Sequence, residues 1–376
     1  MFGQSDLRLL SQARFSEVLN SVAKEALQNV PEPNGSHGLE APVFVVGCPR
    51  SGNHLLYHSL LSSGGFAVYE IHSHVFSILA HKFGNLRVLK HRRKLMDAWL
   101  QGWLFKSTGL DAELIRKRIL AECRSAGDFL RIVMEEICRK QNVDRWAENT
   151  PDHVFYLREI KRAFPNALVI HVIRDGRDVA LSLEKIGWIR PLPGHQTQSW
   201  VPGALYWDWA VRKARKIGRE LGQDYTEVHF EDLVLRPKET LKKVGAFIGH
   251  DLDHSSIQQT PIGAISKPNT VFQDSLKTSS SGPIGRWQKS LSAAQISELE
   301  LVIGPLLREL GYSLASAKRP VGFSVRSMRA SYNALFEAKL WLKSRTPLGR
   351  FMRAGLIQGD TDLPASPKSK NPATAP

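Results

Sequence analysis

The sequence predicts a three-layer α/β fold, in which helices flank both faces of a mostly parallel β-sheet. Three segments carry this prediction, because in each a short apolar run leads through a turn into a helical pattern. These segments are residues 41–61, 167–183 and 225–249. Strands that alternate with helices in this way form parallel sheets with helices on both faces.

The first unit begins with APVFVVG (41–47), a β-branched apolar run typical of a buried parallel strand, and continues as the helical pattern HLLYHSLL (54–61). The second unit is ALVIHVIRDGRDVALSL (167–183). The third runs from YTEVHFEDLV (225–234) into a helix with the sequence KETLKKVGAFIG. Between the first two units, residues 111–141 repeat apolar side chains at helical spacing, which predicts helix there.

We divide the chain into a helical arm and linker (1–40), a central domain (41–315) and a basic extension (316–376). In the extension, residues 323–355 interleave aromatic and aliphatic side chains with Arg and Lys, as in an amphipathic helix. Such a helix packs on the central domain or a partner subunit, or it lies on an anionic lipid surface. The sequence leaves these alternatives open, and the Pro/Ser/Lys-rich residues from about 358 are typical of a disordered tail.

The composition is that of a basic globular protein. Lys and Arg number 51 against 36 Asp and Glu, a formal net charge of +15. This excess indicates an anionic partner: a nucleotide, a nucleic acid, an acidic lipid or an anionic glycan. At 376 residues the chain can bury a sizeable core without a disulfide or metal, and we expect no metal.

The cysteine content favours a cytoplasmic protein. The three cysteines form no CxxC pair, and an odd number argues against a closed disulfide framework. We recognise no signal peptide at the N-terminus, and no apolar run reaches the length of a membrane span. We therefore expect a cytoplasmic location, peripheral at the inner membrane surface if the extension binds lipid.

The segment GCPRSGNH (47–54) joins the first predicted strand to its helix, a position suited to binding phosphate. Backbone N–H groups at a helix N-terminus are unpaired, and the helix dipole favours an anion there. Gly47 and Gly52 allow close approach of the backbone, and Arg50 adds a cation with forked donors. An ordinary strand-to-helix turn is the alternative. The other candidate phosphate ligands of the loop are Pro49, Ser51, Asn53 and His54.

Two other classes of protein fit the sequence less well. The glycines match the nucleoside-triphosphate loop GxxxxGK[ST], but Asn53 and His54 occupy its Lys and Ser/Thr positions. Without these groups a P-loop kinase loses its main phosphate and Mg²⁺ ligands, so it is the second hypothesis. The third is a basic nucleic-acid- or membrane-binding protein without catalysis. Because no zinc-finger, RRM or helix-turn-helix signature is present, we expect no nucleic-acid partner.

The second unit carries another candidate phosphate site. Its strand delivers Arg174 to the carboxyl end, and Ser182 follows about two helical turns later. The two side chains could hold one phosphate as a cation and a neutral donor, if the loop folds back toward Ser182. The alternative is that Arg174 pairs with Asp175 or Asp178 and Ser182 only packs.

Together the two segments resemble the nucleotide-binding motifs of the sulfotransferases that use 3′-phosphoadenosine 5′-phosphosulfate (PAPS). PRSG (49–52) resembles the motif that holds the 5′-phosphosulfate, and the Arg174–Ser182 spacing resembles the motif for the 3′-phosphate. The resemblance extends over about 42–312, through WAENTPDH (146–153), the FPNA-containing run before the second motif, VHFEDLV (228–234) and SGPIGRWQKSLS (281–292). It is closer to the bacterial and Golgi-type members than to the cytosolic type.

The resemblance implies a P-loop-like sulfotransferase fold, with 41–315 as the catalytic domain and PAPS as co-substrate. By the same resemblance Phe230 takes the place of a tyrosine at the nucleotide, and Gly285, Arg286 and Trp287 close over it. One departure concerns charge: Asn149 stands where the family has a lysine. Arg50, His54 or Lys90 could supply that charge.

The acceptor needs a base to take its proton. Glu70 lies near the position of the base in Golgi-type members, and His72 and His74 lie on the same segment. If that segment is extended, all three side chains share one face. Cytosolic members of the family use a histidine as the base. His91 resembles that histidine, because a strand-like run precedes it. We infer in-line sulfuryl transfer with Arg50 stabilising the leaving group, Glu70 as candidate base and His72 beside it.

The acceptor is left open as a glycan, lipid or small molecule bearing a hydroxyl or amine. Variable helices and loops, here about 70–145 and 186–206, are expected to form its pocket. Aromatic residues after the second motif line that pocket or the core: Trp188, Trp200, Trp207 and Trp209. A homodimer is a further expectation.

Overall fold

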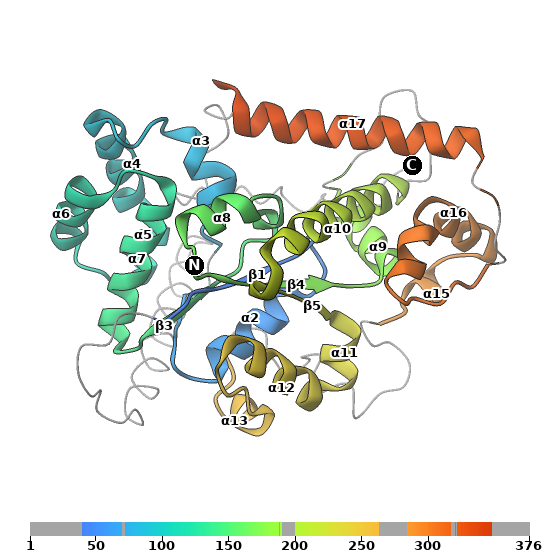
Figure 1. Ribbon diagram of the computed structural model, residues 1–376, viewed down its shortest axis with the longest axis horizontal. Helices are drawn as coiled ribbons and strands as arrows, with labels where there is room; N and C mark the ends of the chain where they lie inside the picture. Colours follow the sequence, from blue (N-terminus) through green and yellow to red (C-terminus); the bar gives the residue numbers. More distant parts are fainter. Residues whose placement is uncertain are drawn as a thin grey trace, which may run out of the picture.

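In the computed structural model the chain forms one parallel sheet with helices on both faces (Figure 1), which confirms the predicted fold class. The structure describes residues 40–69, 72–187, 189, 200–262, 284–316, 320 and 322–347. The predicted N-terminal arm, Glu70, Trp188 and the C-terminal tail from residue 348 lie outside these residues.

The sheet has five strands in the order β2-β3-β1-β4-β5, and all neighbouring pairs are parallel. Central strand β1 pairs Val43 with Leu168 on one side and Phe44 with Glu148 on the other. The strands are β1 (Val43–Val46), β2 (Phe66–Ala67), β3 (Arg145–Glu148), β4 (Leu168–Ile173) and β5 (Tyr225–His229).

Alternate side chains of β1 pack into the two helical layers. Val43 and Val45 face the layer below the sheet in Figure 1, and Phe44 and Val46 face the layer above it. The lower layer consists of α2 (Asn53–Ser62), α11 (Phe230–Leu235), α12 (Pro237–Ile248) and α13 (His254–Gln259).

The upper layer is larger. Long helix α10 carries Trp207 into its core, and helices α4 to α7 extend this layer at one end. Its helices are α3 (Ala80–Lys82), α4 (Leu89–Gln101), α5 (Trp103–Thr108), α6 (Ala112–Glu122), α7 (Ala126–Gln141), α8 (Leu157–Ala163), α9 (Gly176–Ile186), α10 (Val201–Leu221), α15 (Trp287–Ser290), α16 (Ala293–Glu309) and α17 (Phe323–Arg345). Short turns are η1 (Val75–Leu79), η2 (Pro151–Phe155) and η3 (Gly222–Asp224).

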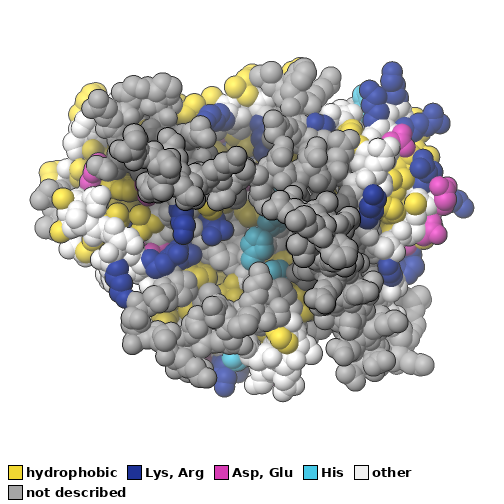
Figure 2. All heavy atoms as spheres, turned by 180° about the vertical axis from the view of Figure 1, so that it is seen from behind, with side chains coloured by type: hydrophobic (Ala, Val, Ile, Leu, Met, Phe, Trp, Pro, Cys, Tyr) yellow, Lys and Arg dark blue, Asp and Glu magenta, His cyan; other side chains and the backbone are white. Residues whose placement is uncertain are grey.

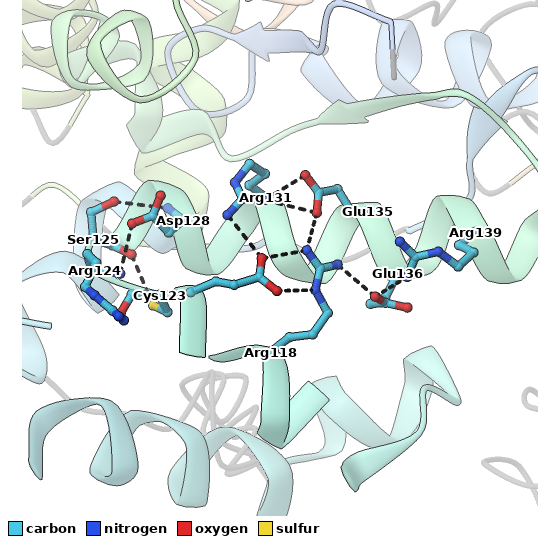
Figure 3. A network of polar contacts seen from close by, with 10 residues as sticks. Arg118, Cys123, Arg124, Ser125, Asp128, Arg131, Glu135, Glu136 and Arg139 are labelled. Atoms are coloured by element: carbon cyan, nitrogen blue, oxygen red, sulfur yellow. Dashed lines mark hydrogen bonds and ion pairs between the residues drawn. The ribbon is translucent and has the colours of Figure 1, made fainter. Parts of the chain in front are cut away.

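The stretch predicted as helix at 111–141 is two helices rather than one. Ser125 begins α7 as its N-cap, with its hydroxyl accepting a hydrogen bond from the Asp128 N–H at 3.1 Å. A network across the break holds α6 on α7, because Arg118 contacts Glu135 at 2.6 Å and Glu136 at 2.7 Å (Figure 3). The apolar spacing continues through residues 111–141, but Ser125 caps a new helix and so divides the stretch in two.

Two further predictions were wrong in detail. FEDLV at 230–234 lies in helix α11 rather than continuing strand β5, which ends at His229. The strand-like lead-in to His91 is absent, because α4 begins at Leu89. Helix α17 packs through Tyr332 and Phe336 onto the core that includes α10, so one side of the predicted amphipathic helix contacts the protein.

Candidate active site

The candidate site residues gather at the carboxyl edge of the sheet. The loop of residues 47–52 follows β1, Arg174 follows β4, and Phe230 follows β5. Strand β1 lies between β3 and β4, so connections from neighbouring strands leave in opposite directions at this edge. Open parallel sheets bind their ligands at such a point.

The loop after β1 has a tightly constrained backbone. Gly52 has φ 93°, and a Cβ there would lie 2.2 Å from the Phe230 ring. Arg50 has φ 73°, a left-handed conformation that costs a non-glycine residue about 1 kcal/mol or more. The Asn53 amide donates to the Gly47 carbonyl oxygen at 3.3 Å and closes the loop. Asn53, which replaces the lysine of triphosphate-binding loops, therefore stabilises the loop itself.

The loop presents several donors to an anion. Helix α2 begins at Asn53, so its first N–H groups have no partner within the helix. Among the described residues, the buried Ser51 hydroxyl also has no hydrogen-bond partner. His54 is exposed in the first turn. A buried hydroxyl without a partner is costly, so this loop is complementary to an oxyanion.

The two predicted phosphate motifs meet directly. Arg50 Nε donates a hydrogen bond to Ser182 Oγ at 2.9 Å, and Arg174 Nη1 donates to the Arg50 carbonyl oxygen at 3.2 Å. Because the Ser182 oxygen accepts from Arg50, the Ser182 hydrogen stays available for a third group. The sequence paired Ser182 with Arg174, whereas the structure bonds Ser182 to Arg50 and joins Arg174 to the same cluster through the Arg50 backbone.

Arg174 is a buried cation that lies beside an aromatic ring and a carboxylate. Its guanidinium lies over the Phe230 ring at 4.5 Å, and its Nη2 lies 3.6 Å from Asp178 Oδ2. Burial lowers the pKa of Arg174, an effect that Asp178 partly offsets. The Asp178 pairing that the sequence left as an alternative is therefore present, but it does not remove Arg174 from the site.

The segment of residues 285–287 is fixed over this cluster by α9. Asp178 accepts hydrogen bonds from the backbone N–H groups of Gly285 at 2.8 Å and Trp287 at 3.1 Å. The Arg177 guanidinium lies 3.7 Å from the centre of the Trp287 ring. Arg286 is exposed and its charge acts on Arg174. Arg177 is itself paired with Asp175 and Glu300, so it positions Trp287, whereas Arg174 and Arg286 add positive charge near the phosphate loop.

The candidate base His72 lies beside the phosphate loop. Its ring is 4.8 Å from the ring of His54 and 5.6 Å from that of His74. Figure 2 shows histidine side chains gathered near the middle of one face, with lysine and arginine side chains beside them. His72 Nδ1 contacts the Asn149 carbonyl oxygen, which can only accept, so the proton is on Nδ1 and Nε2 can serve as a base.

The neighbouring candidates are less suited to that role. Burial, together with the charge of His72, lowers the pKa of His74 to about 4, which makes it a weak base. His74 also has φ 47°, so the segment is not extended as the shared-face argument assumed. His91 contacts the Asn85 carbonyl oxygen at 3.0 Å at the start of α4, and Lys90 is exposed on that helix. Glu70 lies outside the described residues.

A buried carboxylate at the end of β3, that of Glu148, holds the His72 segment by hydrogen bonds. Glu148 accepts hydrogen bonds from Ser73 Oγ at 2.7 Å, from His153 Nδ1 at 2.8 Å and from the Thr150 hydroxyl. Burial alone would raise the pKa of Glu148, but its contacts with His153, Thr150 and Ser73 lower it to about 2. His153 Nε2 in turn accepts the Phe76 N–H at 3.2 Å. Glu148 is therefore ionised. It holds the His72 segment directly through Ser73 and indirectly through His153, which bonds to Phe76.

Asn149 marks the gap in charge expected from the sequence. Its side chain is buried, and neither its oxygen nor its nitrogen has a hydrogen-bond partner among the described residues. This side chain belongs to the residue whose backbone carbonyl oxygen orients His72. The predicted aromatic pocket is mainly core: Trp200 and Trp207 are buried around α10, whereas Trp209 lines a groove against α17.

Sequence reasoning missed two positioning residues. Glu148 was quoted only as part of a motif, and Arg177 was given no role, although both are buried and charged. Buried charges are paired, so a carboxylate at the end of a strand followed by Thr and His was a usable signal. Their partners come from distant segments, which the sequence alone does not bring together.

An α/β sheet with an anion-binding loop after β1 and arginines after β4 defines a nucleotide-binding protein of the P-loop type. The chain belongs to the sulfotransferase family, whose model matches residues 42–254, more than half of the chain. This confirms the family that the motifs resemble.

Several known proteins are similar to this chain. A Drosophila melanogaster protein-tyrosine sulfotransferase is 24% identical over 295 residues, which cover 74% of this chain and 53% of that protein. The chain thus spans about half the length of this relative. The sulfotransferase domain from the curacin biosynthetic pathway is 16% identical with a TM-score of 0.48, covering 74% of this chain and 100% of that domain. The sulfotransferase domain of a Synechococcus olefin synthase is 18% identical with a TM-score of 0.46, covering 76% and 100%.

Proposed function

We propose that this protein transfers a sulfuryl group from PAPS to an acceptor hydroxyl or amine and releases adenosine 3′,5′-bisphosphate (PAP). The observation that carries the proposal is the direct contact between the two phosphate motifs, Arg50 with Ser182 and Arg174 with the Arg50 carbonyl. A nucleotide with phosphates at both ends of its ribose needs two such sites close together. Membership of the sulfotransferase family supports the same activity.

The residues divide between the two phosphates. The loop amides, Ser51 and His54 would hold the 5′-phosphosulfate, whereas Arg174 and Ser182 would hold the 3′-phosphate. Trp287 and Arg286 would cover the nucleotide from the segment that Asp178 fixes. Asn53 stabilises the loop rather than supplying the charge of a kinase lysine, which argues against the P-loop kinase alternative.

In the transfer step the acceptor oxygen or nitrogen attacks sulfur, and the bond from sulfur to the bridging oxygen breaks. The electron pair leaves with the 5′-phosphate of PAP, where the Arg50 guanidinium would stabilise the developing charge. Among the described residues that guanidinium contacts only Ser182, so it could reorient toward the leaving oxygen at the cost of one hydrogen bond. The proton of the acceptor passes to a base.

We assign the base to the segment that follows β2. Glu70 stays a candidate from the resemblance, and His72 is the candidate that the described geometry supports. Its Nε2 has the lone pair and its ring contacts His54 of the phosphate loop. Proton transfer by such a group accounts for about 10²- to 10⁴-fold in rate.

For the acceptor, the cellular location and the oligomeric state we propose only broad classes. A glycan, a lipid or a small molecule is possible, and the name of the fly relative adds a tyrosine side chain of a protein. A cytoplasmic location and a homodimer also remain proposals. Within the described part of the chain, no helix is both long and apolar enough to span a bilayer.

Thermal unfolding with nucleotides tests the proposal. PAP at about a hundred times its dissociation constant should stabilise the protein by about 2.7 kcal/mol, whereas ATP with Mg²⁺ should have little effect. Equal stabilisation by both ligands would refute it in favour of a kinase. Incorporation of ³⁵S from labelled PAPS into a panel of phenols, sugars and amines then identifies the acceptor class.

A further inference from the structure

Helix α17 exposes two of its four aromatic side chains on one side. Phe323 is 87% exposed and Trp341 is 58% exposed, and they are the exposed large aromatic residues of the described chain. They are separated by about five helical turns, so they point the same way about 27 Å apart along the axis. Leu342, beside Trp341, is 39% exposed. Exposed aromatic and aliphatic side chains on a helix that also carries Lys and Arg are typical of helices that lie on a membrane surface.

The exposed side is not the side that packs on the protein. Tyr332 and Phe336 are buried against the core, and Glu337 accepts hydrogen bonds from Trp209 Nε1 and Lys213, both of α10. Figure 1 shows α17 crossing the outside of the molecule over α10. The helix therefore has one face committed to the fold and a second face, with Phe323 and Trp341, directed outward.

The exposed ionic side chains of α17 are mostly basic. Arg329 and Lys343 reach toward Asp208 and Asp152 at 3.4 and 3.6 Å, so their charge is partly neutralised. Lys339 and Arg345 are exposed. The single carboxylate of the helix is Glu337, and Lys213 pairs with it at 2.8 Å.

We propose that this outer face of α17 docks onto a bilayer that contains anionic lipid. Phe323, Trp341 and Leu342 would enter the headgroup region, and Arg345, one helical turn after Trp341, would contact lipid phosphates. Lys339 is exposed at the edge of the groove against α10, from which its long side chain would reach the same phosphates. A second copy of the chain is a poorer partner, because two such faces would bring like charges together in a protein of net charge +15.

Docking through α17 would also orient the candidate active site. Lys343 contacts Asp152, which lies in η2 directly after Thr150 and close to the buried Glu148 network. The lipid-binding face and the His72 segment are therefore linked through η2. An acceptor presented at the bilayer surface would meet a site held at a fixed orientation.

The experiment is co-sedimentation of the full chain with vesicles of phosphatidylcholine, with and without phosphatidylserine. The wild type should bind only the vesicles that contain phosphatidylserine, and binding should fall as salt rises. The double variant Phe323→Ser, Trp341→Ser should bind at least about tenfold more weakly, since apolar burial is lost. Leu235→Ser is the matched control, because Leu235 is 64% exposed on α11, away from this face.

A second variant tests the charges. Lys339→Glu with Arg345→Glu should weaken binding about tenfold or more and remove its salt dependence. Unchanged melting temperatures would show that both variants fold. The proposal would be overturned if the wild type did not bind the vesicles. It would also be overturned if the Phe323→Ser, Trp341→Ser variant lost no more binding than Leu235→Ser. Light scattering that shows a wild-type dimer and a monomeric Phe323→Ser, Trp341→Ser variant would likewise overturn it, because the face would then join two copies.

Discussion

Arg50 and Ser182 are 132 positions apart in the chain and share a hydrogen bond of 2.9 Å. The bond joins the loop after β1 to helix α9 after β4, and thus joins the two motifs that the sequence assigns to different phosphates. Arg174 strengthens the junction by donating to the backbone of Arg50. Two adjacent parallel strands bring these residues together because their carboxyl ends lie at the same edge of the sheet.

Replacing Ser182 by alanine should weaken PAP binding about tenfold, because a hydrogen bond to a charged group is worth about 1.5 kcal/mol or more. Isothermal titration with PAP measures the dissociation constant. Ser331→Ala on α17 is a matched control, since Ser331 is exposed and its hydroxyl contacts only its own helix. An unchanged affinity in Ser182→Ala would exclude Ser182 from the nucleotide site.

Arg174→Ala should abolish the stabilisation by PAP. The substitution removes a buried cation that lies over Phe230 and beside Asp178, so the 3′-phosphate would lose its main ligand. Differential scanning fluorimetry gives the shift. Arg158→Ala, which removes an exposed arginine of α8 paired with Glu220, should keep the full shift. Arg174→Ala with a native circular dichroism spectrum and a normal PAP shift would contradict the assignment.

Gly52→Ala should disrupt the phosphate loop. A Cβ at Gly52 would lie 2.2 Å from the Phe230 ring, and φ 93° is unfavourable for alanine. We expect a loss of stability of about 1 to 3 kcal/mol in urea unfolding and weaker PAP binding. Adding Phe230→Ala should not restore binding, since the strain in φ remains and the ring under Arg174 is lost. Full recovery would mean that the steric contact alone sets the effect.

His72→Ala should lower kcat by about 10²-fold or more and leave the PAP shift intact, because the base acts only on the acceptor. His74→Ala is the comparison, since His74 has a pKa near 4 and is expected to affect kcat less. The pH profile of kcat decides between Glu70 and His72. If His72 is the base, the fall of kcat on the acidic side of the profile, where the base becomes protonated, should be lost in His72→Ala, whereas a profile changed only in Glu70→Gln assigns the base to Glu70.

The stability of the protein should fall in acid partly through Glu148. Its pKa is about 2 in the folded state, against 4.5 in an unfolded chain. A carboxyl whose pKa is depressed by folding contributes stability above the unfolded pKa, and that stability is lost as pH falls from about 4.5 toward 2. Urea unfolding across this range should show a shallower pH dependence for Glu148→Gln than for the wild type.

At neutral pH the Glu148→Gln variant should also be less stable by about 1 to 3 kcal/mol, because a neutral amide has one acceptor oxygen where the carboxylate accepts from Ser73, Thr150 and His153. Glu135→Gln is a control in the partly exposed Arg118 network, where the cost should be smaller. An identical acid dependence in Glu148→Gln and wild type would rule out Glu148 as an ionised anchor.

Several elements were predictable from local sequence. The apolar runs before Gly47 and Arg174 became strands β1 and β4, and both lead directly into helices. Strand β3 was not predicted, because RWAE carries two charged residues in four positions. Those charges are buried and paired, Arg145 with Glu40 and Glu148 with His153, and only the folded chain supplies the partners.

The residues of the candidate site could be predicted from the sequence, but their contacts with one another could not. The loop after β1 and the Arg174–Ser182 spacing indicated phosphate ligands. The sequence did not indicate that Phe230 would pack between Gly52 and Arg174, or that Asp178 would fix the segment of Trp287. Each of these contacts joins segments that are far apart in the chain.

By itself the sequence determined the strand–turn–helix units, the anion-binding character of the loop and the basic, amphipathic nature of α17. These depend on short-range spacing, glycine conformations and helix termini, which are local properties. Only the tertiary structure decided that Arg50 bonds to Ser182, that Glu148 anchors the His72 segment, and which side of α17 is exposed. These depend on how separate elements pack, because a hydrogen bond or a buried surface needs both partners in place.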